Sequence, residues 1–477
     1  MVENKMYRIA FPGAIKRINP QQVADALVIA VVISLPWSTS VTASLIGLWL
    51  LSALPFLRSP WLQRFGFTQV SRWPSAAVIL SDFLKSLTAP AGAFPVLLWL
   101  IAALGMLWAD VSWHERLRDM AGFHKLLVIP LLLNQFSRST RAQYVLAGFL
   151  FSCTVLLILS WISVLWPAVA RHAYPGIPVK DYIAQSGEFV LCAFGSLHIA
   201  LNAVKIKRHL TGLVFAGLAL TFLINVFYVA TSRTQLVVFP FLLVVFGIQR
   251  FGLRGAYVAL ATGTVLASLV WFTSPYLRGR AISVVQAIHH SQAGDPPASA
   301  DVPLISAEQH LSFLKRSIQI IEQAPLIGHG TGSITELFRQ SAAGQTGADA
   351  IVSTNAFNQT FAVAIQLGIL GVIALYAMWI SHAILMFSLP GLGGWIGSLL
   401  VIQSVMSSLF NSHLFDFTQG WIYVFGVGVI GGVAMQQRQN ANLSVGWGRP
   451  SAQASSRRRG VAPARTRTID RENRRDK

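Results

Sequence analysis

The chain has 477 residues, of which 54% are hydrophobic and only 12% are charged, and its mean hydropathy is +0.56. Soluble globular proteins carry about 25% charged residues, so this composition excludes an ordinary soluble enzyme and predicts a polytopic membrane protein. The formal net charge of +19 comes without an aromatic and basic binding module, so we expect no nucleic-acid partner. Two cysteines, Cys153 and Cys192, give neither a metal-ligand pair nor a disulfide framework.

Twelve apolar segments have roughly the length needed to cross a bilayer. They lie at residues 24–37, 41–57, 94–108, 123–133, 145–166, 189–204, 213–230, 236–248, 256–272, 361–387, 395–409 and 421–435. We therefore predict an all-α polytopic membrane protein with about twelve transmembrane helices. The predicted parts are an N-terminal segment at 1–22, helices 1 to 9 at 23–275, one large loop with short helices at 276–355, helices 10 to 12 at 356–436, and a basic disordered tail at 437–477.

Basic residues indicate which side of the membrane each connection faces. Arg138, Lys205 and Arg250 follow even-numbered segments, and an arginine cluster ends the chain. Cytoplasmic connections are enriched in lysine and arginine, so we expect both termini in the cytoplasm. The large loop and the turn at Arg233 then face outward. In a bacterial host the protein would sit in the inner membrane, with this face in the periplasm and touching membrane lipids.

Arg233 stands between two apolar segments, on the face where the charge pattern disfavours arginine. An ionisable side chain at such a depth indicates function. Ser232 and Thr234 add hydroxyl donors on either side, and together the three residues are typical of an oxyanion clamp. The alternative is an arginine that extends to a lipid phosphate.

The large loop carries a second basic pair, Lys315 and Arg316. Apolar residues recur at helical spacing around it and predict a helix over 310–323: Leu311, Leu314, Ile318 and Ile321. Lys315 and Arg316 are expected on the opposite side of that helix. A guanidinium binds phosphate with two hydrogen bonds, which an ammonium group cannot do, so this pair is a candidate anion site. The alternative is a solvated helix face.

A glycine-rich turn at 328–333 follows, and its backbone amides could approach an anion closely. It lacks the lysine of a nucleotide-binding loop, so ATP is excluded as a ligand. Asn355 and Asn358 end the loop: one is expected to cap the next helix and the other to face a cavity, with Gln366 two turns further along. The loop's histidines and carboxylates lack metal-ligand spacing, so we expect neither a metal nor another cofactor.

These motifs together resemble the O-antigen ligase/polymerase superfamily over roughly residues 116–435. The resemblance rests on the Ser-Arg turn, the late loop with its arginine helix, Pro-Leu-x-Gly-x-Gly-x-Gly, and Asn-x-x-Asn followed by Gln-Leu-Gly-Ile-Leu-Gly. It implies a metal-independent glycosyltransferase of the GT-C type. The donor would be a glycan on undecaprenyl diphosphate and the acceptor the lipid A–core of lipopolysaccharide. The family's diphosphate-binding arginines match Arg233 and Arg316.

One position departs from the family pattern. The family has a histidine directly before the last asparagine, and it is held to activate the acceptor hydroxyl; here Phe357 precedes Asn358. Phenylalanine cannot accept a proton, so His329 is the first substitute to consider as base, with Asp349 and Glu308 behind it. Asn358 would position the acceptor. An O-antigen polymerase, a protein O-oligosaccharyltransferase, a lipid-linked glycan transporter and an inactive homologue remain alternatives.

Overall fold

The computed structural model describes residues 20–52, 76–169, 175–273 and 302–447, with a few isolated residues between 278 and 285. The structure is all-helical, with 80% of it in helices and no strand in these ranges, which confirms the predicted fold class. It divides into two units, 1–436 and 437–477, and the contacts discussed below belong to the first. The expected N-terminal segment, the early part of the large loop and most of the basic tail lie outside the described residues.

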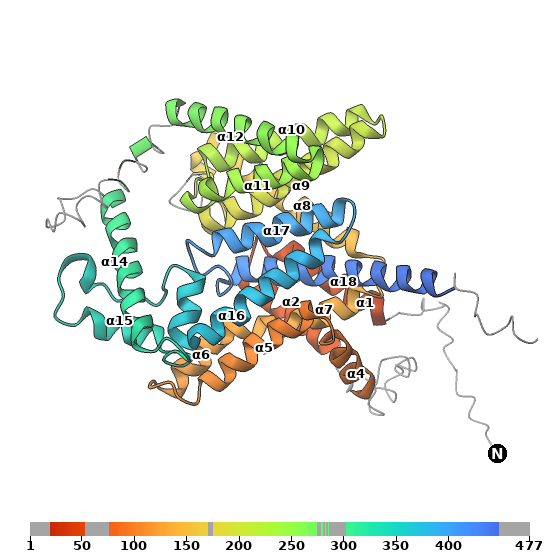
Figure 1. The fold of residues 1–477 in the computed structure, drawn as a ribbon. Helices are drawn as coiled ribbons and strands as arrows, with labels where there is room; N and C mark the ends of the chain where they lie inside the picture. Colours follow the sequence, from red (N-terminus) through yellow and green to blue (C-terminus); the bar gives the residue numbers. More distant parts are fainter. Residues whose placement is uncertain are drawn as a thin grey trace, which may run out of the picture. The chain divides into compact units, whose positions relative to one another are not determined.

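The helices follow the apolar segments of the sequence in chain order (Figure 1). The first half of the chain forms α1 (Pro20–Ser34), α2 (Thr39–Ser52), α4 (Ala76–Ser86), α5 (Pro90–Gly105), α6 (Trp113–His124), η3 (Lys125–Leu127), α7 (Val128–Phe136), α8 (Ala142–Leu165), η4 (Pro167–Val169) and α9 (Tyr182–Lys205). The second half forms α10 (His209–Tyr228), α11 (Arg233–Phe251), α12 (Leu253–Thr273), α14 (Val302–Gln323), α15 (Ile334–Ala342), η5 (Gly347–Ala350), α16 (Gln359–Phe387), α17 (Leu392–Ser407) and α18 (Phe417–Trp447).

Seven of the described helices are long and apolar enough to cross a membrane. The count rises to eight if residues 80–86 and 90–105, which meet at a bend of 102°, form one broken span. The predicted count of twelve is therefore not confirmed. Helices α1, α2 and α17 are apolar but shorter, and the segment predicted at 123–133 is divided among α6, η3 and α7. That segment packs inside the protein, where an apolar helix need not span a bilayer.

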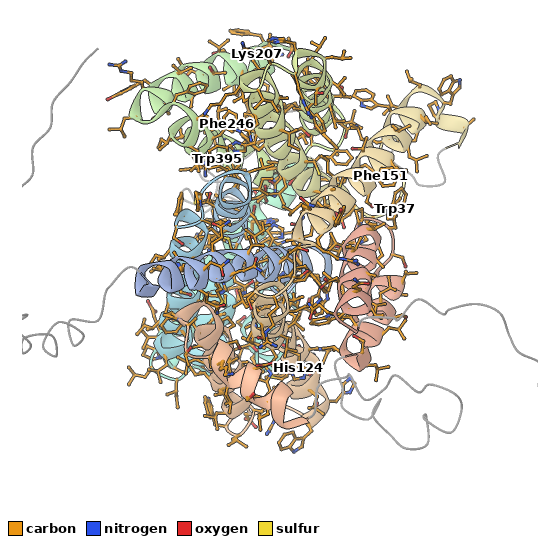
Figure 2. All side chains as sticks on the ribbon, turned by 90° about the vertical axis from the view of Figure 1, so that its right-hand side faces the viewer. Trp37, His124, Phe151, Lys207, Phe246 and Trp395 are labelled. Atoms are coloured by element: carbon orange, nitrogen blue, oxygen red, sulfur yellow. The ribbon has the colours of Figure 1, made fainter. Side chains whose placement is uncertain are left out.

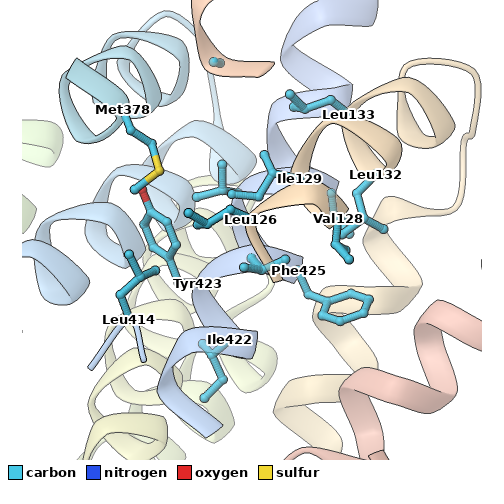
Figure 3. Packing of buried hydrophobic residues seen from close by; sticks show 14 of the residues in the cluster. Leu126, Val128, Ile129, Leu132, Leu133, Met378, Leu414, Ile422, Tyr423 and Phe425 are labelled. Carbon is cyan, nitrogen blue, oxygen red and sulfur yellow. The ribbon is translucent and has the colours of Figure 1, made fainter. Parts of the chain in front are cut away.

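The larger buried core joins the start of the chain to its end. Leu126, Ile129 and Leu132 of η3 and α7 pack in one cluster with Tyr423 and Phe425 of α18 (Figure 3). Leu414, from the connection between α17 and α18, belongs to the same cluster. The core therefore reaches that connection and fixes one side of it.

In a second core, helices α8, α9, α10 and α11 pack together and against α17. The ring of His198 in α9 lies 4.7 Å from Phe246 of α11 and 5.4 Å from Trp395 of α17, and the last two are labelled in Figure 2. Between the two cores lies an apolar cavity of about 510 Å³. Because α17 contributes to both cores, the connection that follows it is held between them.

Helix α16 is interrupted at Gly368, whose φ is 59°. The interruption exposes backbone groups that need partners, and the turn after α14 supplies them. His329 N donates to Ile365 O at 2.8 Å, and Gly330 N donates to Gln366 O at 2.9 Å. The loop is thereby docked on the side of α16, as the positions of α14 and α15 beside α16 in Figure 1 also show.

Candidate functional site

The predicted arginine turn forms the beginning of α11. Ser232 is the residue before the helix and is buried, and Arg233 is the first helical residue and half-buried. Two residues further, Gln235 Nε2 donates to Ser407 Oγ at 3.3 Å. Ser407 is the last residue of α17, so this hydrogen bond joins the first turn of α11 to the end of α17.

Both asparagines at the end of the large loop contact the segment 408–416, which we call the α17–α18 connector. Asn355 Nδ2 donates to Asn411 Oδ1 at 3.1 Å, and its Oδ1 accepts from Ser412 Oγ at 2.6 Å. Asn358 caps α16, accepting from the amides of the next turn, and its Nδ2 donates to Leu409 O at 2.9 Å. The prediction that one asparagine caps the helix is confirmed, and both asparagines also anchor the connector.

Two more residues, Gln359 and Lys125, form hydrogen bonds that hold the connector. Gln359 N donates to Ser408 O at 2.8 Å, and Gln359 Oε1 accepts from Leu414 N at 3.0 Å. The ammonium of Lys125 donates to the carbonyls of Phe415 and Asp416, at 3.1 and 2.9 Å. Burial lowers the pKa of Lys125 to about 8, against the opposing effect of the nearby Asp416. The connector is therefore held in one conformation by α16 and η3 together.

The connector contains an ionisable pair that sequence reasoning missed. His413 Nδ1 lies 2.8 Å from Asp416 Oδ2. The histidine side chain is 3% exposed, whereas the aspartate side chain is 38% exposed. The available signal was the polar run Asn411-Ser412-His413 with Asp416, placed between two apolar segments. This run is short and lies between two apolar segments, so its composition alone does not distinguish it from an ordinary connection between helices.

Phe357 is the residue at which the sequence predicts a departure from the family pattern. Its backbone has a φ of 51°, which few residues other than glycine adopt. The ring stacks on Phe313 of α14 at 5.2 Å, and the ring of His310 lies 4.8 Å away. Phe357 thus closes an apolar cluster under the loop, and it has no group that can exchange a proton.

Arg316 is buried, 5% exposed, contrary to the prediction that it points away from the packed side of its helix. Its five N–H groups all donate within the loop: two to the hydroxyl of Ser341, and one each to the carbonyls of Phe338, Asp349 and Ile351. The reason for the error is that α15 and η5 cover this side of α14 and bring unpaired carbonyls with them. In this structure the guanidinium organises the loop, and its predicted contact with a diphosphate remains a prediction.

The other loop candidates have hydrogen-bond partners within the loop or lie exposed on it. Lys315 is exposed on α14. His329 is half-buried and its Nε2 lies 3.0 Å from Ile320 O, so it ties the glycine turn to α14. Asp349 of η5 accepts a hydrogen bond from Ser312 of α14. Glu308 lies earlier in α14.

The glycine turn does not present its amides to an anion. Each amide from 328 to 333 donates to an oxygen of the protein itself. A Cβ at Gly328 would stand 2.4 Å from the backbone of Gln366, so only glycine allows this approach. The turn packs against α16, and the prediction that its amides bind an anion is wrong for this structure.

A protein-family model described as O-antigen ligase matches residues 217–376. Residues 217–376 are thus similar to the O-antigen ligase superfamily. A search of curated proteins finds no match. The matched range of this O-antigen ligase domain contains the first turn of α11, α14, the glycine turn, Asn355 and Asn358.

The structure brings part of the predicted site together. Asn355 and Asn358 hold the connector, and the helical turn that begins at Arg233 contacts Ser407, the residue directly before the connector. Arg316 and His329 instead bond within the loop. The connector itself lies beyond the matched range. Among the described residues, no group of three or more histidines, cysteines, aspartates and glutamates is placed to hold a metal ion.

Proposed function

We propose that the chain is an O-antigen ligase of the inner membrane. It would transfer a glycan from undecaprenyl diphosphate to the lipid A–core of lipopolysaccharide at the periplasmic face. The observation that carries this proposal is that the Arg233 turn, through Gln235, contacts the end of α17 at Ser407, while Asn355 and Asn358 contact the connector that follows directly. Ligase and polymerase activities both belong to this superfamily, and the choice of lipid A–core as acceptor is the finer part of the proposal.

In this proposal Arg233 meets the charge of the diphosphate. A diphosphate leaves readily only if its growing negative charge is stabilised in the transition state. A half-buried guanidinium offers two parallel hydrogen bonds in an environment where they are stronger than in water. Ser232 stands beside it as a hydroxyl donor.

Asn358 and Asn355 have a different task. Their side chains fix the connector against the start of α16, so the acceptor would meet a rigid surface beside Arg233. Holding two lipid-anchored substrates in one orientation removes much of the entropic part of the barrier. The membrane supplies the same advantage, because both substrates are confined to one leaflet.

The test is transfer by purified protein in liposomes containing a lipid-linked glycan and one of three acceptors. Lipid A–core should gain glycan, and a polymer of repeat units or a glycosylated pilin peptide should not form. Glycan added to either of the other acceptors, and not to lipid A–core, would assign the polymerase or the protein-transferase activity. In the host, loss of the gene should leave lipopolysaccharide without O-antigen and allow lipid-linked polymer to accumulate.

A matched pair of arginine variants connects the activity to the site. Arg233→Ala should abolish transfer while the protein still inserts and elutes as a single species. Arg339 is 55% exposed in α15 and pairs with Glu336, so Arg339→Ala should leave transfer unchanged. Equal activity in the two variants would refute the role of Arg233.

A further inference from the structure

The α17–α18 connector holds an aspartate and a histidine that the O-antigen ligase domain does not include. His413 Nδ1 and Asp416 Oδ2 are 2.8 Å apart, and Asn411 Nδ2 lies 3.4 Å from the same carboxylate oxygen. Of the two, the carboxylate is the accessible member, since its side chain is 38% exposed and that of His413 only 3%. A substrate approaching the connector therefore meets Asp416 first, with His413 behind it.

His413 also lines a small cavity with several polar residues in its wall. His413 lines it together with Gln403, Ser407 and Gln419, and its volume is about 10 Å³, which is near the minimum for one water molecule. Within the described residues, His413 Nε2 and Gln403 Oε1 have no hydrogen-bond partner although both are buried. Such unpaired buried atoms are rare unless a water or a functional demand accounts for them.

The pair also lies where the proposed site converges. Asn411, which contacts Asp416, is itself held by Asn355 of the loop end. Ser407, which lines the cavity beside His413, accepts from Gln235 in the first turn of α11. Two hydrogen bonds, through Asn411, thus connect Asp416 to Asn355 at the loop end. His413, the partner of Asp416, shares a cavity with Ser407, which bonds the first turn of α11.

We propose that Asp416 is the general base of the transfer reaction and that His413 positions it. This assignment rests on the proposed function. As the acceptor oxygen forms its bond to the anomeric carbon of the donor glycan, the O–H bond breaks and its proton passes to a carboxylate oxygen of Asp416. The bond between the anomeric carbon and the diphosphate oxygen breaks at the same time, and the diphosphate leaves with the electron pair.

The roles follow from the geometry of the pair. His413 donates its Nδ1–H to one carboxylate oxygen and leaves the exposed carboxylate to reach the acceptor. Lys125 contacts the main-chain carbonyl of Asp416 and so fixes the backbone from which this carboxylate extends. Phe357 cannot take a proton, so a base supplied by the connector replaces the one that the family places in the loop.

The first experiment measures transfer in liposomes by Asp416→Asn. Asparagine keeps the shape of aspartate and can still accept from His413, but it cannot act as a base. The turnover number kcat should fall on the order of 10²- to 10⁴-fold, with little change in KM for the donor. Asp110→Asn, which alters an exposed carboxylate elsewhere, should be as active as the wild type.

The second experiment separates chemistry from folding. Asp416→Ala should regain part of its activity when formate is added, because a small carboxylate can occupy the space and accept the proton. Formate should not restore Arg233→Ala. For the positioning role, His413→Asn keeps a donor near the place of Nδ1 and should retain more of kcat than His413→Leu, with equal KM for the donor.

The outcomes are distinct. A wild-type protein that transfers no glycan to any acceptor would overturn the proposed function and this assignment with it. An active wild type with a fully active Asp416→Asn, or an Asp416→Ala that folds but does not respond to formate, would overturn the assignment alone. If Asp416→Asn does not fold, the formate response of Asp416→Ala decides.

Discussion

Replacing Arg316 tests whether its guanidinium holds the loop or binds the donor. The side chain is 5% exposed and donates five hydrogen bonds, three of them to the main-chain carbonyls of residues 338, 349 and 351. A hydrogen bond to a charged group contributes about 1.5–3 kcal/mol, and an unpaired buried carbonyl costs about 1–3 kcal/mol. Ile351 is partly exposed, so water can replace one partner. Arg316→Ala should therefore destabilise the loop by about 3–5 kcal/mol, in the range found for breaking buried charged contacts.

Arg316→Lys sharpens the test because it keeps the positive charge. A single ammonium cannot span carbonyls that lie on both α15 and η5, so most of the loss should remain. The assay is amide hydrogen exchange over residues 334–351 in detergent, where local opening free energy is read directly. A loss of about 3 kcal/mol corresponds to exchange faster by about 10²-fold, since each 1.4 kcal/mol is a factor of ten. Arg339→Lys, an exposed neighbour, should change exchange little.

The two interpretations of Arg316 then give opposite results. If the guanidinium organises the loop, exchange accelerates in Arg316→Lys and transfer falls along with it. Unchanged exchange in a variant that has lost transfer would refute the structural role and restore the diphosphate contact predicted from the sequence.

Three other changes have definite expected outcomes. Arg233→Lys keeps the charge but loses the planar fork, so kcat for transfer should fall by about 10- to 100-fold, which corresponds to the loss of about one hydrogen bond to a charged group; an unchanged kcat would contradict bidentate binding. Gly368→Ala should lower the melting temperature in detergent, because its φ is 59° and its Cβ would lie 2.4 Å from Leu326, whereas Gly217→Ala, in open space on α10, should stabilise by up to about 1 kcal/mol. Phe357→His should change transfer little, and a large gain would mean that the chain is an impaired form lacking its base.

The helices themselves were predictable because long apolar segments in a chain with few charges have few other structures open to them. The number of membrane spans could not be predicted in the same way. An apolar segment has the same composition whether lipid or protein covers it, and the segment around Leu126 is covered by α18 rather than by lipid. The helix of α14 was also predicted, although it begins at Val302 rather than at His310.

The sequence predicts that α14 is a helix more readily than it predicts which side of that helix is buried. Helical spacing predicts a buried stripe that includes Leu314 and Ile318, but both are exposed, whereas Arg316 is buried. Helical spacing identifies a stripe but not the partner that covers the opposite side, and here α15 and η5 bring carbonyls that need a donor with several N–H groups. An arginine satisfies them, so a charged residue became part of the packed side.

The same argument explains how the chain can place phenylalanine at position 357. On the loop side this position faces Phe313 and His310 rather than an open cavity, so an aromatic ring there adds packing to the loop. On the proposal that Asp416 is the base, the chain needs no proton acceptor at position 357. Asn355 lies two residues away and contacts the connector that carries Asp416. The proposed base on the connector is therefore compatible with a loop closed by Phe357, and the Asp416→Asn and Phe357→His variants test the two parts of this proposal separately.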